Sequence, residues 1–241
     1  MTEEDESSRR RGYGLDRVLA ISDGVFAFAV TLLVLDLFVP VLSPGASSAD
    51  LWAALSKEYV SFMNYLLSFL IAGVWWNAHH RNFELIRGSN STLRWLNLLF
   101  LLWIALLPFF TRMLDQYNTL QIAVVLYATD QAAAGLTLTL TWWYASRNHR
   151  FVDKNMKGRT IRFRILSDAI PPIFFIISMG ISFIGPTVAS YSWLGMIPVF
   201  FLVHRWGQKV KRNSQELSHM KRGRAQHEGV FGIPRKEGKD C

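Results

Sequence analysis

The sequence predicts an all-helical membrane protein with six membrane-spanning helices in each chain. The chain has 241 residues, of which 51% are hydrophobic, and the apolar residues come in long blocks separated by charged segments. A block of roughly 20 mainly apolar residues is long enough to cross the hydrocarbon core of a bilayer as a helix. Lysine and arginine are also distributed unevenly among the joining segments, which predicts one orientation.

Six apolar blocks reach this length. In order along the chain, they cover residues about 17–39, 59–80, 92–111, 120–145, 165–185 and 188–206. The bounds of the fourth and fifth blocks are less sharply defined than those of the first three. The fourth block contains Asp130 and Gln131, and the fifth contains Asp168, Pro171 and Pro172.

Positive charge fixes the orientation. Of the 26 lysines and arginines, 24 lie in segments that six spans place on one side of the membrane, and the other two are Lys57 and Arg112. Segments rich in lysine and arginine stay in the cytoplasm. We therefore expect a cytoplasmic tail at 1–16, a six-helix transmembrane domain at 17–206 and a basic cytoplasmic tail at 207–241. The expected location is the cell membrane, that is, the inner or plasma membrane.

The basic composition has a simple explanation in this topology. A net charge of +8 also suits nucleic acid, but the sequence carries no recognition motif for it. Attraction to anionic lipid of the inner leaflet accounts for the charge. Membrane lipid is thus an expected partner, and nucleic acid is not.

The first block, RVLAISDGVFAFAVTLLVLD at 17–36, combines an apolar stripe with an acidic residue. On a helix, Phe28, Leu32 and Leu35 follow at spacings of four and three and form one stripe, whereas Asp23 lies about 140° from Phe28. An ionisable residue inside a span marks an ion path or a buried partner. We expect Asp23 to bind polar groups on neighbouring helices, while the stripe either packs or constricts a path.

The second block supplies polar partners at the same depth. Its cytoplasmic end reads WWNAHHRNF and contains Trp76, His79 and His80. We expect these groups to join Arg17, Ser22 and Asp23 of the first block in one polar network. His79 and His80 point in different directions on a helix, so the pair does not form a two-histidine metal site.

No pattern in the sequence indicates catalysis. HExxH, a glycine-rich phosphate loop, GxSxG and a repeated acidic metal motif are all absent, and the one cysteine is the last residue, Cys241. The sequence predicts neither an enzyme nor a resident cofactor or metal.

Three segments together resemble the transmembrane protein 175 family: RVLAISDGVFAFAVTLLVLD, WWNAHHRNF and LNLLFLLWIALLPFFTR. The resemblance covers the first 112 residues well and the rest by span count. It implies a cation channel, mainly for potassium, that lacks the TVGYG filter of ordinary potassium channels. It also implies a homotetramer in which four first helices line the pore, with Phe28, Leu32 and Leu35 as the constriction and Thr31 as the nearby polar group.

The family pattern also assigns a role to the polar cluster. The resemblance implies that Arg17, Ser22 and Asp23 hold the pore helix against the second and third helices. The chain departs from the pattern at two positions. Ile21 stands where phenylalanine is usual before Ser-Asp, and Phe28 stands where isoleucine or leucine is usual in the constriction, so gating or conductance can differ.

Two other classes of function stay open. A proton-conducting or proton-coupled protein would use Asp23, His79 and His80 as titrating groups, because histidine changes charge near neutral pH. A membrane-embedded enzyme would need a catalytic constellation that the sequence does not display. Potassium is the expected permeating ion, with sodium and protons as further candidates.

Overall fold

The structure is a computed structural model that describes residues 3–195. The chain in this range is helical throughout apart from loops. The elements are α1 (Glu3–Val34), α2 (Ser48–Lys57), α3 (Tyr59–Phe83), α4 (Ser91–Gln116), α5 (Gln121–Ser146), η1 (Arg147–His149), α6 (Gly158–Ile181), α7 (Pro186–Ser192) and η2 (Trp193–Gly195). Five of these helices are long and apolar enough to cross a membrane: α1 from Gly14 onward, α3, α4, α5 and α6.

These five helices correspond to the first five expected spans. α3 and α4 begin within one residue of the expected positions, and α1 ends at Val34, five residues before the expected end. α6 begins at Gly158, in the basic segment ahead of the expected span. The expected sixth span, 188–206, begins in α7 and η2, and its residues 196–206 lie outside the described part of the chain, as does the expected tail at 207–241.

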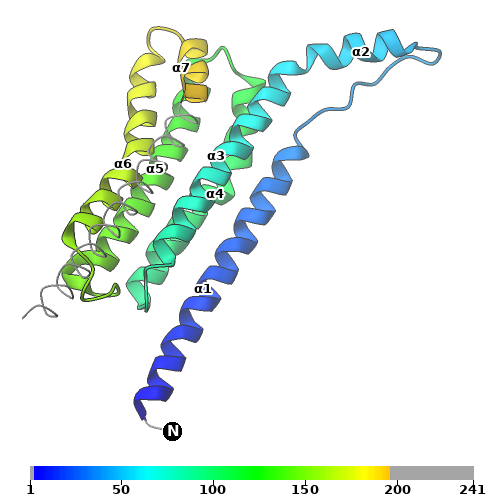
Figure 1. Cartoon of the computed structure of the whole chain (residues 1–241). Coiled ribbons are helices and arrows are strands. Elements are labelled where there is room, and N and C mark those ends of the chain that lie inside the picture. Colours follow the sequence, from blue (N-terminus) through cyan, green and yellow to red (C-terminus); the bar gives the residue numbers. More distant parts are fainter. Residues whose placement is uncertain (1–2, 196–241) are drawn as a thin grey trace, which may run out of the picture. The chain divides into compact units, whose positions relative to one another are not determined.

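The long helices lie side by side in an order that leaves α1 at one edge. α1 packs against α4 and α3, α4 packs against α5, and α5 packs against α6 (Figure 1). Successive long helices alternate in direction, so α1 begins at the end where α3 finishes and α4 begins. We call this the basic end, because Arg87, Arg94 and Arg150 lie there, and the opposite end the α2 end.

Local sequence explains how α2 and α4 begin. The side chain of Ser47 accepts a hydrogen bond from the backbone of Asp50, and Asp50 in turn accepts one from the backbone of Ser47, which is a capping box at the start of α2. The side chain of Asn90 accepts a bond from the backbone N–H of Leu93 at the start of α4, with an N···O distance of 2.9 Å.

One glycine is required for close packing in the middle of the bundle. A Cβ atom at Gly135 of α5 would lie 2.6 Å from a ring atom of Trp75 on α3 and 2.8 Å from a ring atom of Pro172 on α6. Only a residue without a side chain lets these three helices approach so closely. The proline pair in α6 is compatible with a membrane helix, where neighbouring groups compensate for the missing backbone bond.

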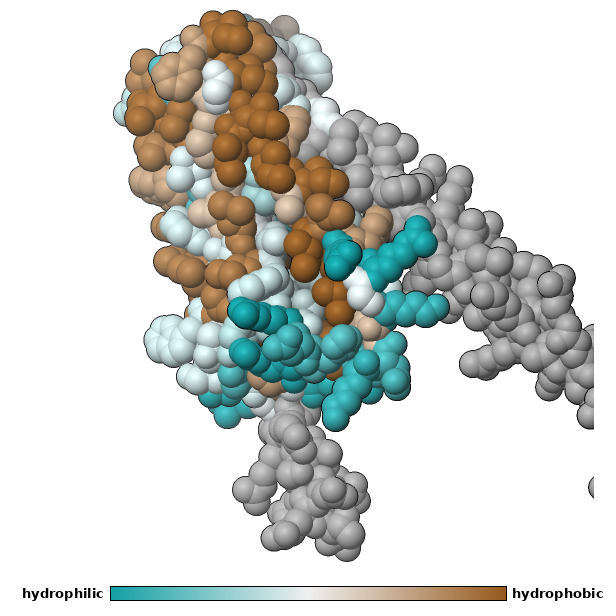
Figure 2. Space-filling model, turned by 90° about the vertical axis from the view of Figure 1, so that its left-hand side faces the viewer, coloured by the Kyte–Doolittle hydropathy of each residue, from teal (hydrophilic) through white to brown (hydrophobic). Residues whose placement is uncertain are grey.

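The core lies among all five long helices. Phe26, Ala29 and Leu33 of α1 are buried in the main apolar cluster, which continues through α3, α4, α5 and α6. Elsewhere on the described helices, large apolar side chains are exposed on many faces. Figure 2 shows hydrophilic residues gathered toward one end of the visible face, with apolar residues over most of the remainder. A surface with this many exposed apolar side chains is suited to contact with lipid.

Candidate functional site

The two faces of α1 have opposite environments. Val18, Ser22, Phe26, Ala29 and Leu33 recur every three or four residues and are buried against the neighbouring helices. The opposite side carries Phe28 and Leu32 of the expected constriction stripe, and Leu35, the third member, follows directly after the end of α1. On this stripe Phe28 is 66% exposed and Leu35 is 74% exposed, while Leu32 is half-buried.

Thr31 lies beside this stripe and is also exposed. Its Oγ1 donates a hydrogen bond to the backbone oxygen of Phe28, one turn earlier, over 2.8 Å. The hydroxyl hydrogen of Thr31 is therefore already engaged in a hydrogen bond within the helix. The oxygen lone pairs remain directed away from this bond and are available to a cation or to water.

Ser22 and His79 are joined through Asn97 of α4, and we call these three residues the buried polar bridge. Asn97 Nδ2 donates to Ser22 Oγ over 3.1 Å, and His79 Nε2 lies 2.8 Å from Asn97 Oδ1. Ser22 Oγ donates onward to the backbone oxygen of Val18 over 2.8 Å. Because an amide oxygen only accepts, the bond to Asn97 Oδ1 requires His79 to carry a proton on Nε2.

Aromatic rings enclose the histidine of this bridge. The ring of His79 stacks on Phe83 with centroids 4.3 Å apart and on Phe100 with centroids 5.4 Å apart, and Phe26 of α1 packs at 6.2 Å. His79 is 2% exposed. The bridge therefore ties α1, α3 and α4 together in a site closed to solvent.

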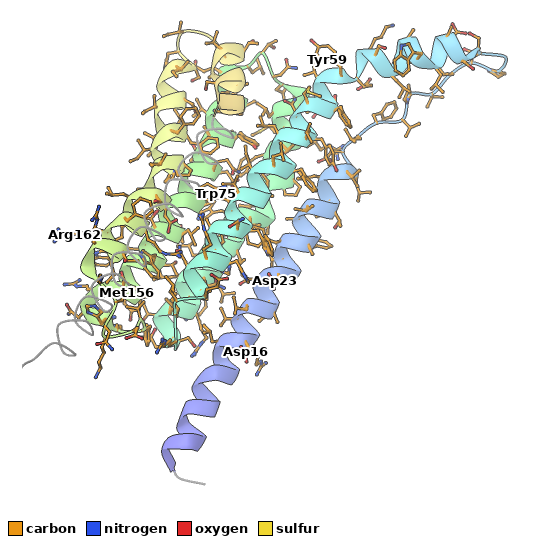
Figure 3. The ribbon with its side chains drawn as sticks, in the orientation of Figure 1. Asp16, Asp23, Tyr59, Trp75, Met156 and Arg162 are labelled. Atoms are coloured by element: carbon orange, nitrogen blue, oxygen red, sulfur yellow. The ribbon has the colours of Figure 1, made fainter. Side chains whose placement is uncertain are left out.

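Asp23 belongs to a separate, exposed arrangement. Trp76 Nε1 of α3 donates to Asp23 Oδ1 of α1 over 3.0 Å, and Asp23 is labelled on α1 in Figure 3. Trp76 also stacks on His80 with centroids 5.6 Å apart, and His80 Nε2 lies 3.4 Å from Glu84. We call Asp23, Trp76, His80 and Glu84 the exposed polar chain.

The expected single cluster is thus divided between two networks. Ser22 and His79 are in the buried polar bridge, whereas Asp23, Trp76 and His80 are in the exposed polar chain. Arg17 is exposed and joins neither network within the described part of the chain. Sequence reasoning missed Asn97 and Glu84. A single amide in the otherwise apolar run LNLLFLLWIALLPFF was the available signal for Asn97.

Polar groups also tie the other end of α1 to the bundle. Asp36 follows α1 and lies 3.5 Å from Arg112 of α4, while Asn64 of α3 donates to Asp115 of α4 over 3.0 Å. These groups, together with Tyr65, line a small polar pocket at the α2 end. Burial raises the pKa of Asp36, Arg112 lowers it by attraction, and repulsion from Asp115 raises it further, so that the pKa stays above its ordinary value.

Comparison with known proteins identifies the family. Residues 17–108 match the family model described as "Endosomal/lysosomal potassium channel TMEM175". A potassium channel of Streptomyces collinus is 32% identical over 187 residues, which cover 75% of this chain and 89% of that protein. The chain belongs to the TMEM175 family. The family description is that of an ion channel, as the sequence resemblance predicts, and not of an enzyme.

Other members of the TMEM175 family extend the comparison. The crystal structure of a TMEM175 homologue from Chamaesiphon minutus, titled a lysosomal potassium-selective channel homologue, matches with a TM-score of 0.68 and 25% identity, over 79% of this chain and 97% of that chain. A mouse member, named an endosomal/lysosomal proton channel, is 38% identical over 98 residues, which are 39% of this chain and 20% of that protein.

The range matched by the TMEM175 family model contains the candidate residues. Residues 17–108 contain α1 from its first buried turn, all of α3 and most of α4. Every residue of the constriction stripe and of the buried polar bridge falls in this range. The candidate residues therefore lie in the part of the chain that matches the family model.

Proposed function

We propose that the chain is a potassium-permeable cation channel of the cell membrane, in which four copies surround one pore. α1 lines this pore, Phe28, Leu32 and Leu35 constrict it, and both termini lie in the cytoplasm. The observation that carries the proposal is the division of α1 into a buried face and an exposed apolar face within a TMEM175 family member.

Geometry supports assembly around α1. One helix cannot enclose a pore, so several copies must contribute the same helix, and closed cyclic symmetry brings the same face of each to one axis. α1 lies at the edge of the described helices, where its exposed face is free to meet other copies (Figure 1). The potassium channel relatives from Streptomyces collinus and Chamaesiphon minutus support the choice of ion.

The constriction stripe is the proposed gate. Its first and last residues, Phe28 and Leu35, are seven positions apart, which is about 10 Å along a helix axis. Rings of large apolar side chains over such a length exclude water and stop ions by dewetting. The hydroxyl oxygen of Thr31, beside the stripe, can replace part of the hydration shell of a cation.

The polar networks have a positioning role in this mechanism. The buried polar bridge fixes the rotation of α1 relative to α3 and α4, because Ser22 must face Asn97 for the hydrogen bonds to form. With Ser22 turned inward, Phe28 and Leu35 are turned outward. We extend this positioning role to Arg17 and Asp23, with Arg17 acting in the assembled channel.

The test is the reversal potential of purified protein in planar bilayers. A potassium gradient at equal pH on both sides should set the potential near that of potassium. Leu32→Ala and Leu35→Ala should each raise conductance, because the shorter side chain widens and wets the pore. Ile177→Ala is the matched control, since Ile177 is exposed on α6, away from α1. Unchanged currents in both leucine variants would contradict the assignment of the pore.

Proton conduction is the second candidate, and the mouse relative named a proton channel favours it. It would use Asp23, His79 and His80. The geometry supports potassium instead, because His79 is enclosed by aromatic rings and Asp23 is bonded to Trp76, away from the constriction stripe. A reversal potential that follows a pH gradient at equal potassium, and ignores a potassium gradient, would establish the proton function.

A further inference from the structure

The short helix α2 carries an apolar face that its own chain does not cover. Leu51 and Leu55 lie within about 40° of each other around the helix, and Trp52 lies about 100° from Leu51. Trp52 is 73% exposed, both leucines are exposed, and α2 contains no buried residue. Asp50 and Lys57 lie on the opposite side. α2 is therefore amphipathic, with its apolar face open.

Something outside the described chain must stabilise this helix. Isolated helices shorter than about 12–15 residues are marginal in water, and α2 has 10 residues. The capping box of Ser47 and Asp50 satisfies backbone groups at its start and so fixes where the helix begins. The cap does not cover Leu51, Trp52 and Leu55, so a covering medium is needed.

The position of α2 in the chain sets its depth. A single residue, Glu58, separates the end of α2 from Tyr59, the first residue of the membrane-spanning helix α3. At Tyr59 the chain changes direction, and α2 leads away from the bundle (Figures 1 and 3). Tyr59 and Tyr117, at the same end of α3 and α4, both have exposed rings. Exposed aromatic rings at the ends of spans mark the boundary between lipid and water.

We propose that α2 lies along the surface of the bilayer at this boundary. Leu51, Trp52 and Leu55 enter the region between lipid headgroups and acyl chains, and Asp50 and Lys57 face water. Trp52 then continues the aromatic boundary that Tyr59 and Tyr117 begin, and this continuity favours lipid over a second protein copy as the occupant. An interfacial helix of this kind buries its apolar face about 5–10 Å into the bilayer.

The charges in and next to α2 predict which lipids are enough to bind it. Asp50 and Glu58 are acidic and Lys57 is basic, so the segment has no excess of positive charge to attract anionic headgroups. Burial of apolar surface alone must hold α2 in place. Binding should therefore be the same in purely zwitterionic bilayers as in bilayers that contain anionic lipid.

The test places a fluorescent label on either face of α2 in the full chain. Cys241→Ser removes the native thiol, and Leu55→Cys or Lys57→Cys then provides one site for a polarity-sensitive dye in phosphatidylcholine liposomes. Label at position 55 should be quenched by a nitroxide near the lipid headgroup and shielded severalfold from aqueous iodide. Label at position 57 should show the reverse. Ser48→Cys, on the apolar side and nearly equal in size, is a second variant in case loss of Leu55 disturbs folding.

Two outcomes would overturn the proposal. Equal iodide quenching at positions 55 and 57 would mean that α2 is free in water. Protection of position 55 from both quenchers, together with disulfide cross-linking between Leu55→Cys chains, would mean that a second copy covers the face. Neither result depends on ion conduction, so potassium flux from the same liposomes tests the channel proposal separately.

Discussion

Removing the amide of the buried polar bridge should destabilise the protein without leaving a cavity. Asn97→Leu keeps a similar volume but deletes two hydrogen bonds, to Ser22 over 3.1 Å and from His79 over 2.8 Å. Ser22 keeps its bond to the Val18 carbonyl, so the loss there is about 0.5–1.5 kcal/mol. His79 is left with an unpaired N–H in a closed site, at about 1–3 kcal/mol. The expected total is about 1.5–4.5 kcal/mol.

A double variant separates the polar penalty from general disruption. His79 stacks on Phe83 and Phe100, so a phenylalanine in its place would keep both stacks. Removing both partners of a buried hydrogen bond can be nearly neutral. Asn97→Leu combined with His79→Phe should therefore recover most of the stability that Asn97→Leu loses. The coupling between the two substitutions should exceed about 1 kcal/mol.

The measurement is unfolding by SDS in mixed micelles, followed by tryptophan fluorescence at fixed protein concentration. Trp76→Phe serves as a control, because it removes the bond to Asp23 on the exposed side of the same helices and should cost at most about 1 kcal/mol. If Asn97→Leu unfolds like the unchanged protein, or if the double variant loses the sum of the two single losses, the bridge does not hold α1 as described.

Two further predictions concern packing and pH. Gly135→Ala should destabilise the fold by about 1–2 kcal/mol, because the new methyl group meets Trp75 at 2.6 Å, whereas Gly73→Ala, with nothing within 4 Å, should be neutral or slightly stabilising in the same unfolding assay. The raised pKa of Asp36 means that its contribution to stability falls as pH rises through that pKa. Arg112→Gln removes the opposing attraction, so it should cost more at pH 7 than at pH 4, by up to about 1 kcal/mol, and Asp36→Asn should abolish this difference.

The long helices were predictable because length and composition alone determine them. Every apolar block from the first to the fifth became a helix, and no knowledge of neighbours was needed. α2 was not predicted, since ten residues between two spans are too few to give a membrane signal. Its capping box, Ser47 with Asp50, is visible in the sequence but identifies only where a helix can begin. Pro40 limits how far α1 can extend, yet the helix ends earlier, at Val34.

Most members of the polar site were predictable, but Asn97, Glu84 and the connections between the members were not. Ser22 and Asp23 are adjacent in sequence, and a helix turns about 100° between them, so they face different neighbours. Which neighbour each one meets depends on the rotation of α3 and α4. That rotation is set by packing across the whole bundle, including the close approach at Gly135. Asn97 could be noticed as a lone amide, but its two partners follow only from the three-dimensional arrangement.

The attachments of α1 determine how it can move. The buried polar bridge holds it at Ser22, and the ion pair with Arg112 holds the chain at Asp36, about 20 Å further along by helical rise. Between these points the contacts of Phe26, Ala29 and Leu33 are apolar and have no directional preference. Polar contacts at both ends resist rotation of α1, so a change in its shape is expected as bending between them rather than as turning. Phe28 and Leu32 lie in that central part, so the proposed gate lies where bending of α1 is opposed by apolar contacts alone.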